Sequence, residues 1–312
     1  MSLPSLPVRL DAEELAIETE GLEKRYGPSA VRALAGLDLQ VPAGSVYVLA
    51  GPNGAGKSTA MKVLLDLVRA DRGTARVCGL ETTKRPALVR AHIGYVPEGV
   101  ETAYGWLTAR AFLQHHAAFY GAWDWGYTDE LCRRLAVPLH EKVKGLSKGA
   151  LRRLMLVTAL AHRPPVLLLD EPTDGLDPLA REDFSALLVE HMTQSPTTVL
   201  WSTHHVHEAD RMADHVGVIE DGRLVLQAPR DTLTERLRRY RAQVPPAWAG
   251  APGLNGDVLV REGSGREIAW TVWGEEREVA GRLQAAGAVL QGATPLSLED
   301  ATLALLRAGR AA

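Results

Sequence analysis

One eight-residue segment constrains the fold of this chain more than any other: GPNGAGKS at residues 51–58. An apolar run, Val46 to Ala50, leads into it, and apolar residues recur at helical spacing over residues 58–70. In a strand–glycine loop–helix unit, backbone N–H groups turn inward around an anion and the helix directs its positive end there. The alternative is a chance glycine turn, which would not need the strand before, the helix after or the Lys-Ser pair. The segment therefore predicts a phosphate-binding loop.

The same segment matches the pattern G-x-x-x-x-G-K-[ST] in full, which predicts a nucleotide and Mg²⁺ as cofactors. Lys57 would bring a point charge to the β- and γ-phosphates and so assist catalysis, and the Ser58 hydroxyl would be a ligand for Mg²⁺. The residues expected to contact ATP here are Gly51, Pro52, Asn53, Gly54, Ala55, Gly56, Lys57, Ser58 and Thr59.

Two acidic residues follow a second apolar run, Val166 to Leu169, which reads as a buried parallel strand. Asp170 is predicted to hold Mg²⁺ through water, and Glu171 to polarise the attacking water as general base. Paired acids at the end of a strand also serve as helix N-caps. The aliphatic strand and the phosphate loop upstream favour the catalytic interpretation.

Between these motifs lies Leu146-Ser147-Lys148-Gly149-Ala150, followed by an amphipathic helical pattern. The segment resembles the signature sequence of the ABC ATPases, usually written Leu-Ser-Gly-Gly-Gln. The resemblance implies a homodimer with two composite sites, in which Ser147 and Gly149 of one copy contact the ATP held by the phosphate loop of the other, again at a helix N-terminus. An ordinary serine N-cap is the alternative.

Three more matches fall in the order of that family. Tyr26 in KRYG resembles the aromatic residue that stacks on adenine, with a surface tyrosine as the alternative. Asp177 in GLDP resembles the loop that crosses the dimer interface and contacts the site, and otherwise it is a turn or N-cap residue. His204 in STHH resembles the histidine that senses the γ-phosphate and takes part in catalysis, with His205 as the competing choice.

The chain departs from the usual ABC pattern at two places. Glu98, in YVPE, stands where the family usually has glutamine; it can still be a metal ligand, and a surface loop glutamate is the alternative. Lys148 and Ala150 replace the first glycine and the final glutamine of the signature. These replacements resemble the ATPases of ABC-2-type exporters, as do, more loosely, FYGAWDW at residues 119–125 and SLEDATLALL at residues 297–306.

An aromatic cluster occupies residues 104–127. It has two interpretations: the packed core of a helical subdomain, or a groove that receives a short helix of a membrane subunit. A basic stretch, residues 230–241, is expected to be helical, and its part from Arg236 to Arg241 is expected to form a solvated face rather than a lipid-binding patch.

The expected fold class is α/β: a P-loop NTPase of ABC type, with a mostly parallel sheet core, a helical subdomain and an antiparallel β edge, plus a small C-terminal α+β domain. Residues 1–14 are expected to be a tail. The ATPase domain is placed at residues 15–229, with the helical subdomain at about 99–163. A Pro/Gly/Ala-rich segment, 245–256, reads as a linker inside an accessory domain at residues 230–312.

The overall composition bounds the function. A net charge of −3 and an isoelectric point near 6.4 provide no general basic field, so no nucleic acid is expected as a partner. The two cysteines, Cys78 and Cys132, form no disulfide framework or zinc motif, and the N-terminus has no secretory pattern. No apolar run of about 18 residues occurs, so a transport path would have to come from other subunits.

The predicted function is therefore ATP hydrolysis that powers transport, and on the subgroup resemblance export, through separate membrane-spanning permease subunits at the cytoplasmic face of the membrane. Two alternatives stay open. One is a soluble ABC ATPase acting on ribosomes or nucleic acid, which the single ATPase unit and the absence of sustained heptads disfavour. The other is an ATP-binding switch that barely hydrolyses, which intact Glu171 and His204 disfavour.

Overall fold

The computed structural model describes residues 10, 14–27, 32–99, 104–246, 248, 250–251, 254 and 257–311. Nearly all of the expected N-terminal tail, residues 1–14, lies outside the described residues. Six strands form the central sheet in the order β11-β10-β4-β9-β8-β7, parallel from β10 to β7, with β11 antiparallel at one edge. Their bounds are Val46–Ala50 (β4), Ile93–Val96 (β7), Val166–Asp170 (β8), Thr198–Thr203 (β9), His215–Glu220 (β10) and Arg223–Pro229 (β11).

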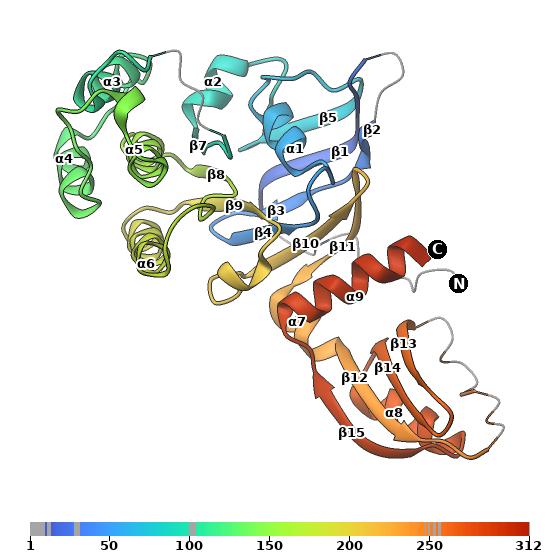
Figure 1. Cartoon of the computed structure of the whole chain (residues 1–312). Helices are drawn as coiled ribbons and strands as arrows, with labels where there is room; N and C mark the ends of the chain where they lie inside the picture. The colour runs from blue at the N-terminus through green and yellow to red at the C-terminus, as the bar shows by residue number, and fades with distance from the viewer. Residues whose placement is uncertain are drawn as a thin grey trace.

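The sheet is buried on both faces, which explains its continuous apolar strands. In β4, Tyr47 and Leu49 belong to one core, while Val46 and Val48 belong to another. The first core is closed by α1, Lys57–Leu64, and by an antiparallel sheet. That sheet has the order β2-β1-β5-β6, with β3 also paired to β1 (Figure 1). Its strands are Leu15–Arg25 (β1), Arg32–Leu37 (β2), Gln40–Pro42 (β3), Arg72–Val77 (β5) and Leu80–Glu81 (β6).

Helices form the other side of the molecule, at the left of Figure 1. They begin where the sequence supplies side-chain caps: Thr108 accepts a hydrogen bond from the N–H of Ala111, and Asp124 accepts one from the N–H of Tyr127. The helices on this side are Ala109–Ala117 (α3), Trp125–Arg134 (α4), Lys148–Leu160 (α5) and Pro178–Gln194 (α6), with α2, Pro86–Ala91, above the sheet.

The C-terminal residues form a third sheet, order β13-β14-β12-β15, that is antiparallel throughout. The strands of this sheet are Leu237–Gln243 (β12), Val258–Ser264 (β13), Glu267–Trp273 (β14) and Val289–Pro295 (β15). The helices of the same part of the chain are Arg230–Arg236 (α7), Glu276–Ala285 (α8) and Leu298–Ala311 (α9).

The prediction of a helix over residues 230–241 was wrong beyond Arg236. From Tyr240 to Val244 every second residue is buried, the period of a strand, and β12 pairs with β14 on one side and β15 on the other. Three arginines of this stretch form ion pairs with glutamates of neighbouring elements. The pairs are Arg236–Glu275, Arg238–Glu276 and Arg239–Glu262.

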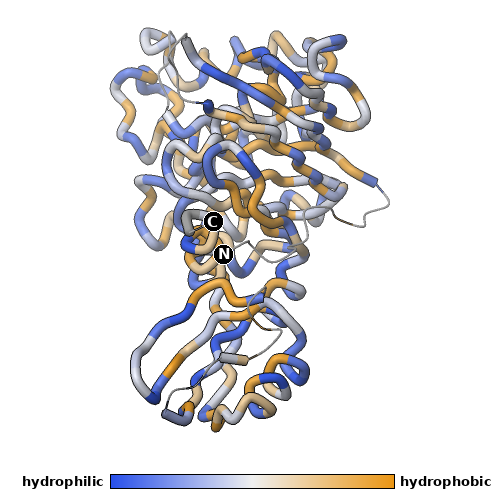
Figure 2. The backbone as a smooth tube through the Cα atoms, turned by 90° about the vertical axis from the view of Figure 1, so that its right-hand side faces the viewer, coloured by the Kyte–Doolittle hydropathy of each residue, from blue (hydrophilic) through white to orange (hydrophobic). Residues whose placement is uncertain are grey.

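The last helix, α9, packs against the part of the molecule that holds the central sheet. Its buried residues Leu298, Ala301 and Leu305 belong to the same core as Val206 and Leu226 of the central body. The end of α9 accordingly lies at the junction between the upper and lower parts of the molecule (Figures 1 and 2). Figure 2 also shows hydrophobic stretches along the interior strands and hydrophilic ones on the peripheral loops. In the described part of the chain, none of the helices has the length and apolar character needed to cross a bilayer.

Candidate functional site

The phosphate loop joins the carboxyl end of β4 to the first turn of α1, as its sequence predicts. Gly56 has a φ of 112°, and a Cβ there would lie 2.5 Å from the carbonyl oxygen of Ala33, so only glycine fits. The loop opens on a cavity of about 260 Å³. The described residues that line it are Ala33, Asn53, Gly54, Gly56, Lys57, Ser58, Thr59, Glu98 and Glu171.

Two of the predicted catalytic residues, Lys57 and His204, contact the carboxylate of the third, Glu171. Glu171 Oε1 lies 3.3 Å from the ammonium of Lys57 and 2.9 Å from His204 Nδ1. The backbone N–H of His204 donates to Glu171 Oε2 at 3.3 Å. The Lys57 ammonium also donates to the carbonyl oxygens of Gly51 and Pro52, at 2.7 and 3.2 Å. The carboxylate therefore lies between a cation and an imidazole at the mouth of the loop.

Glu171 adopts a left-handed backbone conformation, with a φ of 47°, which is uncommon for a residue with a side chain. Its N–H donates to the carbonyl oxygen of Ser202, and its side chain is only 5% exposed. Such strained, buried residues cluster at functional sites. Of the two candidate histidines it is His204 that contacts Glu171; the ring of His205 lies tilted against that of His204, with 3.8 Å between centroids.

Asp170 ends β8 and is almost completely buried, with its carboxylate accepting a hydrogen bond from the Ser202 hydroxyl. Ser58 and Glu98 lie on the cavity wall. Carboxylate and hydroxyl oxygens are the hard donors that Mg²⁺ prefers, so the residues present fit this ion. In the part of the chain that the structure describes, no three His, Cys, Asp or Glu side chains could hold a metal by themselves.

The signature residues lie elsewhere in the same chain. Ser147 is the N-cap of α5 and accepts a hydrogen bond from the N–H of Ala150 at 3.2 Å. A Cβ at Gly149 would meet no atom within 4 Å, so the backbone there is open to an approaching group. Neither residue is among the described residues that line the phosphate cavity. One copy of the chain therefore does not bring the signature to its own phosphate loop.

The two remaining predicted contacts also face outward. Asp177 is the N-cap of α6 and accepts from the N–H of Ala180 at 2.9 Å. Tyr26 is 46% exposed, with the ammonium of Lys24 5.9 Å from its ring centroid. Neither is among the described residues of the cavity wall.

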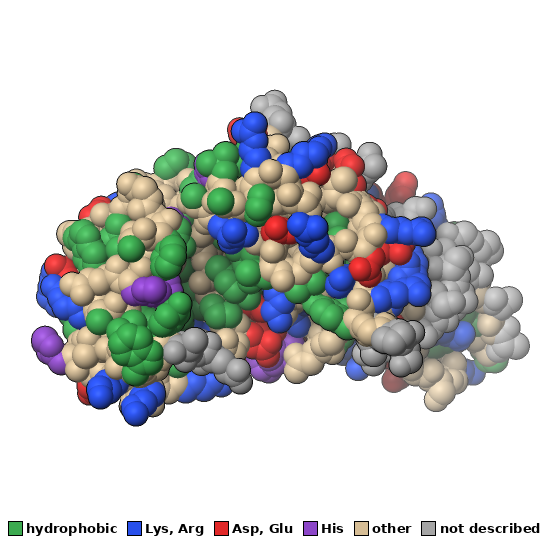
Figure 3. Space-filling view, turned by 90° about the horizontal axis from the view of Figure 1, so that it is seen from above, with side chains coloured by type: hydrophobic (Ala, Val, Ile, Leu, Met, Phe, Trp, Pro, Cys, Tyr) green, Lys and Arg blue, Asp and Glu red, His purple; other side chains and the backbone are tan. Residues whose placement is uncertain are grey.

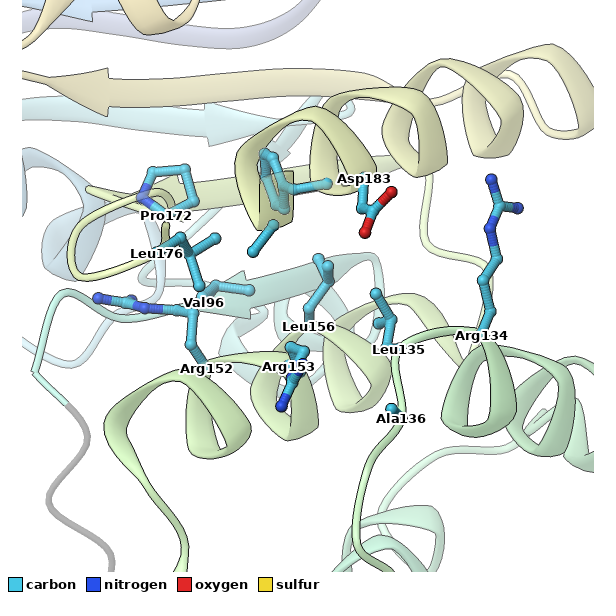
Figure 4. Close-up of a pocket in the computed structure, with 12 residues that line it drawn as sticks. Val96, Arg134, Leu135, Ala136, Arg152, Arg153, Leu156, Pro172, Leu176 and Asp183 are labelled. Carbon is cyan, nitrogen blue, oxygen red and sulfur yellow. The ribbon is translucent and has the colours of Figure 1, made fainter. Parts of the chain in front are cut away.

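Two cationic residues on α5 were not assigned a contact from the sequence. Lys148 Nζ lies 2.9 Å from the carboxylate of Asp174, three residues beyond Glu171, and lowers the pKa of that carboxyl. Arg152 is 4% exposed and donates to the carbonyl oxygens of Pro97 and Glu98. Figure 4 shows Arg152 beside Val96, at the edge of a cavity of about 160 Å³ between α5 and α6. Two adjacent arginines in an amphipathic helix gave no signal that one of them is buried.

The aromatic cluster divides between the two interpretations. Phe112 and Tyr127 are buried and pack in the helical core. Others remain on the surface, where Figure 3 shows hydrophobic side chains gathered on the side of the molecule that carries α3 and α4. The exposed aromatic residues of this side are Tyr104 (38%), Trp106 (67%), Phe119 (72%) and Trp125 (40%).

Comparison with known proteins identifies the family. The family profile described as "ABC transporter" matches residues 34–174, and one described as "AAA domain, putative AbiEii toxin, Type IV TA system" matches residues 139–210. The daunorubicin/doxorubicin resistance ATP-binding protein DrrA of Streptomyces peucetius is 38% identical over 241 residues, 73% of this chain and 72% of that protein. The chain belongs to the ABC transporter ATP-binding family.

Other relatives agree. The bacitracin transport ATP-binding protein BcrA of Bacillus licheniformis is 34% identical over 72% of this chain and 73% of its own length. Among solved structures, an ATP-binding subunit of an ABC transporter matches with a TM-score of 0.63 and 29% identity, covering 70% of this chain and 92% of that one. The predicted fold class, an ABC-type P-loop NTPase with a mixed α/β architecture, is confirmed. This ABC protein is an ATPase by family.

Proposed function

We propose that this ABC ATPase powers export. Two copies would close on two ATP molecules, each held by the phosphate loop of one copy and by Ser147 and Gly149 of the other. Three observations support a composite site: the signature is separate from the cavity within one chain, Gly149 is open to approach, and a similar cassette has been solved as a dimer (24% identity, TM-score 0.62, covering 69% of this chain and 98% of that one). Tyr26 and Asp177, both at the surface, would complete adenine stacking and the dimer interface.

The convergence of Lys57 and His204 on Glu171 carries this proposal. Glu171 would accept a proton from the water that attacks the γ-phosphate, since a carboxylate at the cavity wall is within reach of a bound water. His204 holds the carboxylate through Nδ1 and its own N–H, and presents the imidazole beside the cavity. Lys57 supplies a positive charge to the phosphates. Ser58 and Glu98, with Asp170 through water, would hold Mg²⁺, which neutralises phosphate charge.

Export is favoured by the relatives. DrrA is named for drug resistance, BcrA for bacitracin transport, and a third relative, 37% identical over 70% of this chain and 72% of its own length, is a Nod factor export ATP-binding protein of Burkholderia orbicola. The exposed aromatic surface of α3 and α4 is the candidate docking site for a membrane subunit. In this proposal the protein would act at the cytoplasmic face of the membrane.

The hydrolytic part is tested with Glu171→Gln, and Glu182→Gln on the exposed face of α6 is the matched control. We expect Glu171→Gln to bind ATP, to elute as a dimer with ATP present, and to lose at least about 100-fold in turnover, because the general base is gone. Glu182→Gln should behave like the wild type. Unchanged turnover in Glu171→Gln would refute the assigned base.

The transport part is tested by co-purification from membranes. An integral membrane protein should accompany the wild type and be lost from Trp106→Ala/Phe119→Ala, whereas Leu67→Ala, at an exposed apolar residue that follows α1, should retain it. Association with ribosomes or DNA instead would favour the soluble alternative.

A further inference from the structure

Arg152 is a buried cation on α5. It is 4% exposed, and it forms no ion pair within 4 Å among the residues that the structure describes. Its guanidinium donates to two consecutive main-chain carbonyls, those of Pro97 and Glu98, the second at 2.8 Å. Burying an arginine without a paired carboxylate costs free energy that an apolar residue of similar length would avoid. Its presence therefore needs an explanation other than packing.

The charged surroundings of Arg152 point to the nucleotide site. Burial lowers the pKa of its guanidinium, and the nearby carboxylates of Asp174, Asp170, Glu98 and Glu171 oppose that shift. These acids include the candidate metal ligands and the candidate base. Arg152 is thus the buried positive charge behind the acidic wall of the cavity.

The two hydrogen bonds fix a segment that has no other support in the sheet. Strand β7 ends at Val96, so the carbonyls of Pro97 and Glu98 make no ladder bonds. A planar guanidinium presents paired donors in a rigid fork, which suits two adjacent acceptors. In Figure 4 the Arg152 side chain extends from α5 toward the loop that follows β7. Holding the Glu98 backbone in this way sets where its carboxylate enters the cavity that Ser58 and Glu171 also line.

Arg152 also lies on the helix that Ser147 begins. The first turn of α5 therefore carries the signature residues, and Arg152 in its second turn donates hydrogen bonds to the main chain at Pro97 and Glu98. Displacement of α5 would displace Glu98 as well. The signature would thus be coupled to the cation position of its own chain's phosphate loop.

We propose that Arg152 is a positioning residue for Glu98: its fork holds the main chain at Pro97 and Glu98 so that the Glu98 carboxylate reaches the Mg²⁺ of bound nucleotide. This inference rests on the proposed role of Glu98 as a metal ligand. It assigns to Arg152 an action through Glu98 alone, with no contact to nucleotide.

The test is a double-mutant cycle with Arg152→Met, Glu98→Ala and the combined variant, each titrated with MgCl2 in the presence of a fluorescent ATP analogue. Because supporting residues behind a metal ligand affect metal affinity roughly 10- to 100-fold, we expect Arg152→Met to raise the Mg²⁺ concentration for half-maximal response about 10-fold. Glu98→Ala should raise it similarly, and the combined variant should be no worse than Glu98→Ala. Binding of the analogue in EDTA should change less than about 2-fold.

Two further variants keep the test sharp. Arg153→Met, the neighbouring residue, removes a cation from the same helix and should leave the Mg²⁺ midpoint unchanged. Arg152→Lys keeps the positive charge but lacks the planar pair of donors, so it should raise the Mg²⁺ concentration for half-maximal response less, about 3-fold. This variant replaces Arg152→Met in the test if Arg152→Met does not fold. No shift in Glu98→Ala would overturn the metal role of Glu98 and this inference with it. A shift in Glu98→Ala with none in either Arg152 variant, or with additive shifts in the combined variant, would overturn the inference alone.

Discussion

His204 contacts Glu171 twice: its Nδ1 lies 2.9 Å from Oε1, and its main-chain N–H donates to Oε2. The two residues come from the ends of neighbouring parallel strands, β9 and β8. The backbone bond fixes the carboxylate even without the imidazole, and the ring contact sets its orientation. Substitution of the histidine side chain therefore removes the ring contact and leaves the backbone hydrogen bond in place.

The two adjacent histidines should differ sharply when replaced. We expect His204→Ala to lower ATP turnover about 100-fold, because the imidazole that orients Glu171 is lost, while nucleotide binding remains. His205→Ala removes a ring that packs against the rings of His204 and His207, and it should change turnover less than about 5-fold. Steady-state phosphate release measures both. Equal losses in the two variants would contradict the assignment.

Lys57 should matter for binding more than for folding. Replacing it with alanine removes charge-assisted hydrogen bonds to phosphate, so we expect nucleotide affinity to fall roughly 10- to 100-fold. Glu171 keeps its contact with His204 in this variant, which limits the effect on stability. Lys62→Ala, an exposed lysine on the same helix, is the control. Binding is followed with a fluorescent ATP analogue, and comparable affinity in Lys57→Ala and the wild type would be evidence against the phosphate loop assignment.

The C-terminal helix should influence turnover through its neighbours. A cavity of about 300 Å³ separates Leu303 and Leu306 of α9 from Gly51, Pro52 and His204. We expect Leu303→Trp to displace the catalytic loops and to lower turnover at least about 5-fold, because small misplacements are costly in catalysis. Val289→Trp, another exposed apolar residue in the same domain, should have no effect. Turnover is measured by ATPase assay and folding by thermal unfolding. Equal turnover in the two variants would show that α9 does not influence the catalytic site.

Stability should fall in mild acid because of buried histidines. Burial lowers the pKa of His191 to about 4, and the nearby charge of Arg163 lowers it further. The imidazole of His191 contacts the hydroxyls of Tyr127 and Thr197. The unfolded chain binds the proton near pH 6.5, so stability from this residue is complete above pH 6.5 and is lost as the pH falls toward 4. The loss amounts to roughly 3 kcal/mol at most.

His191→Gln should narrow the difference in unfolding free energy between pH 7.5 and pH 5, measured in urea. His162, whose pKa burial also lowers to about 4, leaves part of that difference in place. A variant with the full pH dependence of the wild type would show that His191 titrates normally in the folded protein.

Local motifs could be predicted because short stretches of chain decide them. The strand Val46–Ala50, the glycine loop and the helix from Lys57 follow from apolar run, glycine positions and helical spacing. The caps at Ser147 and Asp177 are likewise local, since a side chain reaches an N–H three residues ahead. For the same reason the sequence could not tell whether these residues do more than cap.

The helix prediction was wrong at residues 237–243 because contacts distant in the sequence decide the structure there. Three of these seven residues are arginines, which favour a helix, but β12 lies between two partner strands, and ladder pairing on both sides overrides this local preference. Arg152 shows the same limit, because nothing in its neighbours reveals that its guanidinium is buried against Pro97 and Glu98.

The phosphate loop and the residues proposed for ATP chemistry could be predicted from the amino-acid sequence, since backbone conformation and side-chain type are local properties. Which of these residues meet depends on the folded chain: Lys57 and His204 share the carboxylate of Glu171, Arg152 donates to the Glu98 carbonyl, and α9 lies against the loop after His204. These contacts join segments far apart in the chain. They depend on strand order and on helix packing, which form only when the whole core is buried.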